Sequence, residues 1–264
     1  MLPTLFRIGP LEIGTHDAFV ALGALAAAFI YLREAARREM LEERTVWIAL
    51  GALLSGAVAA KASTVLRYVA YAPEPSVTGA ILYGGKSVLG GLAGAYAGAV
   101  ATKRIVGYRE PTGDLFAPAV ALGMAVGRWG CFFTEQVGTP TSLPWGISVD
   151  APTAARIPMC PTCAPGVAMH PSFLYEIAFH ALMFGALVWL RSRVPVRGEL
   201  LKIYLLAYGV FRFAVEFVRG NPAVALGLSY SQLFLIPTTL LLVAYFARRL
   251  ARGIYTVPRF EPAA

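Results

Sequence analysis

The chain has 264 residues, of which 57% are hydrophobic and 14% are charged, whereas a soluble domain carries roughly 25% charged residues. This composition, together with a mean hydropathy of +0.62, excludes an ordinary soluble fold. The formal net charge of +8 is spread between apolar runs and forms no single basic patch, which favours membrane orientation over nucleic-acid binding.

Seven apolar segments predict an all-α, polytopic integral membrane protein with about seven transmembrane helices. They cover residues 18–32, 45–66, 87–101, 115–130, 171–190, 200–218 and 231–246. Spans of about 20 residues joined by short loops use nearly the whole chain, so we expect a single domain over residues 1–264. The segment before the first span lacks the features of a cleavable signal peptide, so we expect the first helix to be retained.

Basic residues mark alternate connections between the predicted spans. They are Arg33, Arg37, Arg38, Arg44, Lys103, Arg104, Arg109, Arg191, Arg193, Arg197, Arg248, Arg249, Arg252 and Arg259. The positive-inside rule makes these segments cytoplasmic, so we expect the N-terminus outside and the C-terminus in the cytoplasm. The two longer loops, at about 67–86 and 131–170, then face outward.

Two spans are rich in small residues, with G-A-L-L-S-G-A-V-A-A after Leu50 and G-G-L-A-G-A-Y-A-G after Leu89. Small side chains allow the backbones of neighbouring helices to approach closely. We interpret both runs as packing surfaces.

Ionisable residues inside predicted spans are the first candidates for function, because a charge buried in a membrane is costly. Arg212, Glu216 and Arg219 follow one another at helical spacing in the sixth span and are expected to share one face. Two guanidinium groups beside one carboxylate suit a phosphate, with Glu216 orienting an arginine or acting as a base. A salt-bridge cluster that only positions the helix is the alternative.

Further polar candidates gather toward the outer ends of the spans. Arg128 ends the fourth span among glycines, and the others are Lys61, Lys86, His170 and Tyr175. Each has an ordinary alternative, such as a cationic side chain that reaches the interface or a histidine that caps a loop. Together they predict a site for an anionic phospholipid headgroup at the outer leaflet. The sequence has no nucleotide-binding, serine-hydrolase or metal-ligand motif, so we expect no metal and no cofactor.

Four ordered motifs carry a resemblance to a known family. They are D-L-F-A-P-A-V-A-L-G-M-A-V-G-R-W-G-C-F from Asp114, G-T-P-T-S-L-P-W-G-I from Gly138, H-P-S-F-L-Y-E from His170 and Y-G-V-F-R-F-A-V-E-F-V-R-G from Tyr208. At these residues the chain resembles the bacterial prolipoprotein diacylglyceryl transferases. The G-G-K-S-V-L-G-G-L run around Ser87 is a fifth, weaker match.

The resemblance implies a multi-pass protein of the bacterial inner membrane with periplasmic outer loops. Its activity would move a diacylglyceryl group from phosphatidylglycerol to the lipobox cysteine of a lipoprotein precursor, without a cofactor. Arg128 matches the family's G-R-x-G arginine, and Arg212, Glu216 and Arg219 match its R-x-x-x-E-x-x-R, so the resemblance implies catalytic roles for them. The residues expected to contact substrate are Arg128, Lys61, Lys86, Glu135, Gly138, His170 and Tyr175.

Three departures from the family pattern concern activation of the acceptor thiol. Leu89 stands where the family commonly has a histidine, and its side chain cannot accept a proton. His16 occupies the place of a family tyrosine and is followed by Asp17, while T-E-Q-V-G after Cys131 is shorter than usual. We therefore expect His16 to act as the catalytic base, with His170 and Glu135 as alternatives.

Three other functions compete with this interpretation. The chain is alternatively a non-catalytic paralogue that binds anionic phospholipid or lipoprotein, or a transferase with a different acceptor. A small-solute transporter is less favoured, because the charges cluster near one face and no inverted repeat is seen.

Three cysteines are too few for a disulfide scaffold. Cys160 and Cys163 form a C-P-T-C pair in the outward loop, where a disulfide or two free thiols are expected. Zinc at this pair would need two further ligands, and only His170 is near. Cys131, beside Gly130, is expected to serve packing.

Overall fold

The computed structural model describes residues 4–9, 11–71, 78, 87–135, 138–155 and 163–255. Its contacts divide the chain into two compact units, one formed by Met1–Ile30 with Thr112–Ala264 and the other by Tyr31–Pro111. The single domain expected over residues 1–264 stays a prediction. The predicted helical architecture is confirmed, because helices make up most of the described residues.

The first unit begins with a small hairpin that the sequence did not predict. Strands β1 (Thr4–Ile8) and β2 (Leu11–Gly14) pair antiparallel, with Ile8 opposite Leu11, and Gly9 has a φ of +60° at the turn. The hairpin precedes the first apolar segment, so hydropathy gives no sign of it. It leads directly into α1 (Thr15–Arg37), the first half of which belongs to this unit.

Four long helices follow in the first unit. They are α5 (Gly113–Thr134), α7 (Ser172–Leu190), α8 (Glu199–Glu216) and α9 (Tyr230–Ala251), with the short α6 (Ala151–Ala154) between α5 and α7. Ala117 and Ala121 of α5 pack with Leu187 of α7 and with Leu200 and Tyr204 of α8 in a buried core. This core holds the three helices side by side.

Glycines bring the first turns of α1 against α5. A Cβ atom at Gly23 would lie 2.6 Å from the carbonyl oxygen of Gly123, and one at Gly130 would lie 2.9 Å from that of His16. No L side chain fits at such distances, so glycine is required for this close approach. The contact at Gly130 places the first turn of α1 beside the last turns of α5.

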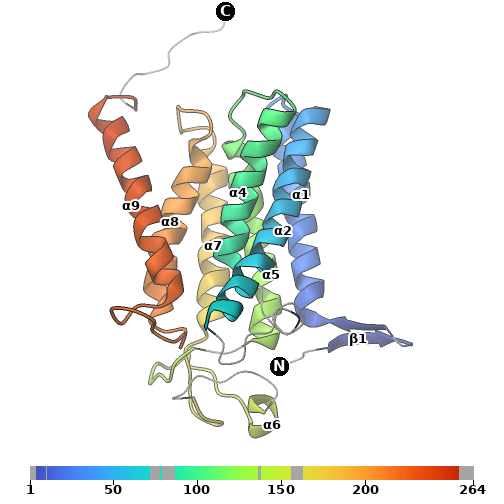
Figure 1. Ribbon diagram of the computed structural model, residues 1–264, viewed down its shortest axis with the longest axis vertical. Helices are drawn as coiled ribbons and strands as arrows, with labels where there is room; N and C mark the ends of the chain where they lie inside the picture. The colour runs from blue at the N-terminus through green and yellow to red at the C-terminus, as the bar shows by residue number, and fades with distance from the viewer. Residues whose placement is uncertain are drawn as a thin grey trace, which may run out of the picture. The chain divides into compact units, whose positions relative to one another are not determined.

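Two groups of polar residues lie at opposite ends of α8 and α9. The start of α9 meets the end of α8, where Ser229 Oγ donates a hydrogen bond to Glu216 Oε1 at 2.6 Å. At the opposite ends of the same helices, Arg249 Nε lies 2.6 Å from Glu199 Oε1. Helices α5, α7, α8 and α9 therefore run in alternating directions, as Figure 1 shows.

The second unit contains the end of α1 together with α2 (Glu43–Tyr71) and α4 (Val88–Ile105). Helix α2 continues beyond its predicted end at residue 66. A Cβ atom at Gly98 would lie 2.7 Å from the carbonyl oxygen of Gly51, and one at Gly56 would lie 3.1 Å from that of Gly91. The interpretation of the small-residue runs as packing surfaces is confirmed.

Five of the described helices are long and apolar enough to cross a membrane, namely α1, α2 over Glu43–Leu66, α5, α7 and α9. Large apolar side chains such as Leu25, Leu182 and Leu241 are exposed on them, as a lipid-facing surface requires. The two other predicted spans correspond to α4 and α8, which are shorter, with 18 residues each. The count of seven spans and their orientation stay predictions.

Candidate active site

A buried carboxylate, Glu176, draws together arginines from separate elements of the first unit. Glu176 lies in the second turn of α7 and has no exposed surface. Arg128 of α5 places Nη2 2.5 Å from Glu176 Oε2, and Arg219, in the turn after α8, places Nη1 2.6 Å from Oε1. Arg212 of α8 lies farther away, with Nε 3.9 Å from Oε1. Three predicted site residues thus converge on one acidic group.

Glu216 is a second buried carboxylate in the same cluster. Its Oε2 pairs with Arg212, one turn earlier in α8, and its Oε1 accepts hydrogen bonds from Ser229 Oγ at 2.6 Å and from Asn221 Nδ2 at 2.9 Å. Helix α8 ends at Glu216, and in the turn that follows the Arg219 N–H bonds the Glu216 carbonyl at 3.2 Å. Arg219 therefore stays near Glu216, although it is not in the helix.

The arginine cluster, defined as Arg128, Arg212 and Arg219 with Glu176 and Glu216, has one excess positive charge. Arg128 and Arg212 each expose only 5% of their surface. Buried charges interact strongly with one another and with any ligand, because water does not screen them. The cluster is therefore suited to an anion, and guanidinium groups match the geometry of phosphate oxygens.

An aromatic side chain contacts two arginines of the cluster. The ring of Phe173 lies 4.5 Å from the Arg219 guanidinium carbon and 5.7 Å from that of Arg128. One turn beyond Glu176, the buried His180 places Nδ1 3.0 Å from the hydroxyl of Tyr204. Within the part of the chain that the structure describes, His180 Nε2 has no hydrogen-bond partner.

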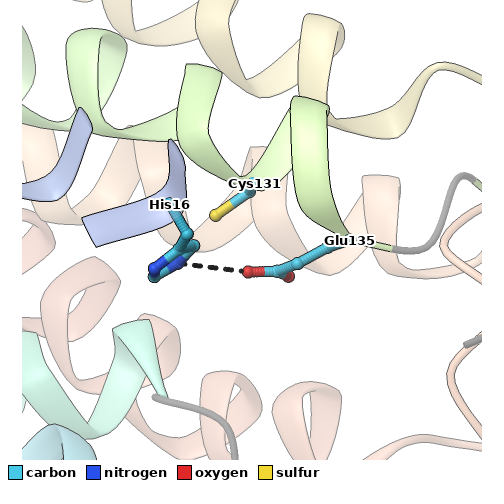
Figure 2. A group of neighbouring side chains, drawn as sticks. All are labelled: His16, Cys131 and Glu135. Carbon is cyan, nitrogen blue, oxygen red and sulfur yellow. Dashed lines mark ion pairs between the residues drawn. The ribbon is translucent and has the colours of Figure 1, made fainter. Parts of the chain in front are cut away.

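A second group of polar side chains lies where α1 begins and α5 ends. His16, Cys131 and Glu135 point toward one another in Figure 2, and their donor atoms all lie within 4.8 Å of one another. His16 Nε2 is 3.4 Å from Glu135 Oε1, and His16 Nδ1 is 3.4 Å from Asp17 Oδ1. Imidazole, thiol and carboxylate are all metal ligands, so these three residues could hold a metal ion.

Glu135 is ionised in this arrangement. Burial raises its pKa, but hydrogen bonds with His16 and Cys131 and the charge of Arg128 outweigh that effect and lower the pKa to about 2. Arg128 also links the two groups, because its Nη1 lies 3.7 Å from Cys131 Sγ. Cys131 is buried, and its neighbours include the polar side chains of His16, Glu135 and Arg128 besides packing partners.

Gly138 fixes the connection between α5 and α7 beside the arginine cluster. Its N–H donates to the His170 carbonyl at 2.8 Å, and the next N–H, of Thr139, donates to the Val218 carbonyl at 2.9 Å. A Cβ atom at Gly138 would lie 2.7 Å from the His170 carbonyl oxygen. Gly138 thus has a positioning role that its backbone explains, and direct contact with substrate stays a prediction.

The hydroxyl of Tyr175 in α7 contacts two loop residues. Trp145 Nε1 donates to it at 2.8 Å, and His170 Nδ1 lies 3.1 Å from it. His170 and Tyr175, both predicted to contact substrate, are therefore neighbours of one another. They form a group separate from the buried ion pairs.

The remaining predicted residues belong to the second unit or to parts of the chain outside the described residues. Lys61 lies in α2, and Leu89 lies in the first turn of α4, whose N-cap Ser87 accepts a hydrogen bond from Gly90 N at 3.1 Å. Lys86 and Cys160 lie outside the described residues. Cys163 is disulfide-bonded. Its expected pairing with Cys160 stays a prediction, because Cys160 lies outside the described residues.

The sequence predicted roles for the three arginines but none for Glu176, the carboxylate between them. Glu176 lies in H-P-S-F-L-Y-E within a predicted span. A charge buried in a membrane is as costly for Glu176 as for the arginines, so the same argument could have identified it as a candidate. Cys131 was assigned to packing because its neighbour His16 lies far away along the chain. Ser229 and Asn221, which bond Glu216, carry no sequence signal of their own.

Comparison with known proteins identifies the family. The family model described as prolipoprotein diacylglyceryl transferase matches residues 3–248. The chain belongs to this family. It is 34% identical to the phosphatidylglycerol–prolipoprotein diacylglyceryl transferase of Synechococcus elongatus, over 83% of this chain and 77% of that protein. It is 32% identical to the protein of that name from Geobacillus kaustophilus, over 94% and 92% of the two chains. The transferase resemblance of the sequence motifs is thereby confirmed.

Proposed function

We propose that this chain transfers the diacylglyceryl group of phosphatidylglycerol to the cysteine thiol of a lipoprotein precursor. Its family and the names of its relatives support a transferase of this kind. The observation that carries the proposal is the buried arginine cluster with its one excess positive charge, which suits a lipid phosphate. The site faces the periplasm from the bacterial inner membrane, where secreted precursors arrive.

The arginines serve the leaving group of this reaction. The acceptor sulfur forms a bond to the glycerol carbon of the diacylglyceryl group while the bond from that carbon to the phosphate oxygen breaks. The thiol gives up its proton, and glycerol phosphate leaves with a second negative charge. Fixed cations stabilise that charge as it develops, and Arg128, Arg212 and Arg219 are the residues proposed for this role. Glu176 and Glu216 hold the guanidinium groups in place.

The group at the start of α1 serves the acceptor thiol. A cysteine thiol with a pKa near 8.5 is mostly protonated at neutral pH, so the reaction needs a base or a cationic field. His16 is the residue proposed to activate this thiol, and Glu135 lies 3.4 Å away as its ionised partner. Trp129, Phe132 and Phe133 form an aromatic cluster on the same turns of α5, as is typical of a membrane interface.

Several further residues are proposed to contact substrates. Binding of lipid phosphate by Lys61 and Lys86 stays a prediction from the sequence. His170 and Tyr175, beside the loop that Gly138 fixes, are proposed to contact the precursor peptide around its lipobox cysteine.

The test uses the purified full chain in mixed micelles. Phosphatidylglycerol labelled in its diacylglyceryl group is supplied with a precursor peptide that contains the lipobox cysteine. We expect a peptide with the mass of the thioether product, together with released glycerol phosphate. Arg128→Gln removes product, whereas Arg252→Gln, an exposed arginine beyond the end of α9, leaves the rate unchanged. A peptide that stays unmodified, under conditions where the Geobacillus kaustophilus relative modifies it, contradicts the proposal.

Leu89 favours one competing function, a non-catalytic protein that binds anionic lipid. A leucine stands where the resemblance implies a histidine base, while the arginine cluster is complete. The same assay separates the two functions. If wild type binds phosphatidylglycerol but forms no lipidated peptide, and Arg128→Gln no longer binds the lipid, the lipid-binding alternative is supported.

A further inference from the structure

His16, Cys131 and Glu135 have the composition of a zinc site. They offer one nitrogen, one sulfur and one oxygen atom, and these lie within 4.8 Å of one another (Figure 2). We propose that these three residues bind one zinc ion and that the fourth ligand position takes the acceptor thiol. The role of the thiol rests on the proposed function, whereas the metal site stands by itself.

The spacing of His16 and Glu135 fits two ligands of one zinc ion. Zinc binds nitrogen and oxygen ligands at about 2.0–2.2 Å, so two ligands of a tetrahedral ion lie about 3.4 Å apart. His16 Nε2 and Glu135 Oε1 are 3.4 Å apart. The sulfur atom of Cys131 lies within 4.8 Å of both ligand atoms.

Asp17 supplies the support that a metal-binding histidine commonly has. Its Oδ1 lies 3.4 Å from His16 Nδ1, while the opposite ring nitrogen, Nε2, faces Glu135. Histidine ligands usually donate their second N–H to a carboxylate, which fixes the ring orientation and makes the ligand nitrogen more basic. The H-D sequence at the start of α1 therefore gives His16 both an orientation and a preferred metal-binding atom.

The backbone preforms the site. Cys131 and Glu135 are one turn apart at the end of α5, where the Glu135 N–H donates to the Cys131 carbonyl at 2.8 Å. Gly130 leaves room for the backbone of His16, so α1 delivers the third ligand without a long flexible segment. Cys131 is buried, but the side chains of His16 and Glu135 remain 27% and 43% exposed, so a fourth ligand can approach from their side.

The proposed ion lies next to the arginine cluster. Arg128 Nη1 is 3.7 Å from Cys131 Sγ, while Nη2 of the same guanidinium pairs with Glu176. A hydrogen bond from arginine stabilises a thiolate ligand. A thiol in the fourth position therefore lies close to the arginines that are proposed to hold the lipid phosphate.

The ion would activate the acceptor without a histidine at position 89. A thiol that coordinates zinc is deprotonated at neutral pH. The proton passes to a zinc-bound hydroxide, which leaves as water, and the sulfur takes its place. The sulfur then forms the bond to the glycerol carbon as the carbon–oxygen bond to phosphate breaks, and the electron pair of that bond stays on the phosphate. No oxidant or reductant takes part.

The site is tested by metal binding without lipid or peptide. Untagged full-length protein in detergent is freed of metal with a chelator and titrated with Zn²⁺ or with Co²⁺ as a spectroscopic probe. We expect about one ion per chain and a thiolate-to-cobalt charge-transfer band. Cys131→Ser removes the band, and His16→Ala and Glu135→Gln weaken zinc binding by at least about 100-fold. Asp17→Asn keeps all three ligands and weakens binding by about 10- to 100-fold.

Two controls distinguish this site from other ligands. Glu39→Gln changes an exposed carboxylate, and the double change of Cys160 and Cys163 to serine removes the other two cysteines; both variants keep the band and the zinc affinity. Each variant is first compared with wild type by thermal unfolding without metal, and Asp17→Asn provides the test if a ligand variant does not fold. A missing cobalt band, or a band that survives Cys131→Ser, overturns the site.

Transfer activity then separates this inference from the proposed function. We expect metal-free protein to lose transfer and to regain it when zinc is added. Full transfer by metal-free protein overturns the role of zinc and leaves the transferase function standing. Zinc binding without transfer in any condition supports the metal site and contradicts the transferase function.

Discussion

Replacing Glu176 by glutamine tests whether this carboxylate organises the arginine cluster. The change keeps the shape of the side chain but removes the negative charge that Arg128 and Arg219 contact at 2.5 and 2.6 Å. The excess positive charge of the cluster rises from one to two. Removing one partner of a buried ion pair costs about 3–5 kcal/mol, because the other charge stays buried. We expect the free energy of unfolding to fall by this amount.

The assay is reversible unfolding in mixed micelles, followed by tryptophan fluorescence, together with the rate of peptide lipidation. Glu39→Gln is the matched control, since Glu39 is exposed, and its unfolding free energy is expected to change by less than about 0.5 kcal/mol. Lipidation by Glu176→Gln is expected to fall at least about 100-fold, because the arginines lose their fixed positions. Unfolding and lipidation both at wild-type levels in Glu176→Gln would refute the organising role of this residue.

Three further predictions address other parts of the first unit. Gly138→Ala displaces the connection between α5 and α7 from Val218, because the added Cβ atom would clash with the Val218 carbonyl. We expect kcat/KM for the peptide to fall at least about tenfold, and an unchanged kcat/KM contradicts this steric argument. Arg219→Lys keeps the positive charge but loses the planar pair of guanidinium N–H donors, so we expect the rate of lipidation to fall about 100-fold. A wild-type rate would mean that a positive charge at position 219 is sufficient for transfer. Burial and a hydrogen bond to Glu199 raise the pKa of Tyr255 to about 12, so this contact stabilises the fold below pH 10 and is lost as the pH rises to about 12. The tyrosinate absorbance of wild type minus that of Tyr255→Phe should titrate near pH 12, and titration near pH 10 contradicts the contact.

The sequence predicts those parts of the fold that repeat a simple pattern. Apolar runs predict the helices, and runs of small residues predict the close approach that Gly56 and Gly98 allow. The β1–β2 hairpin escapes prediction because two short strands carry no strong periodicity. The end of α8 at Glu216 also escapes, because the apolar run continues to Val218. The helix stops where Glu216 is bonded by Ser229 and where the chain approaches Gly220, which has a φ of +73°.

The candidate site divides into parts that a sequence can and cannot predict. Arg128, Arg212 and Arg219 stand out because a charge in a membrane span demands an explanation. Their grouping around Glu176 depends on how α5, α7 and α8 pack, which no local pattern describes. His16 was predicted only as a base, since its partners at the end of α5 lie far away along the chain. A search for metal-ligand spacing within one segment cannot detect such a group.

The end of α5 joins the two halves of the proposed chemistry. Arg128 and Cys131 are neighbours on one helix, and the guanidinium that pairs with Glu176 also reaches the thiol of Cys131. A displacement of α5 would therefore disturb phosphate binding and thiol activation together. Gly130, which admits the backbone of His16, sets the position of this helix end against α1. Leu89 therefore removes one proton acceptor from the family pattern. The contact between α1 and α5 still provides the geometry that the proposed chemistry needs, with an activated sulfur close to a lipid phosphate.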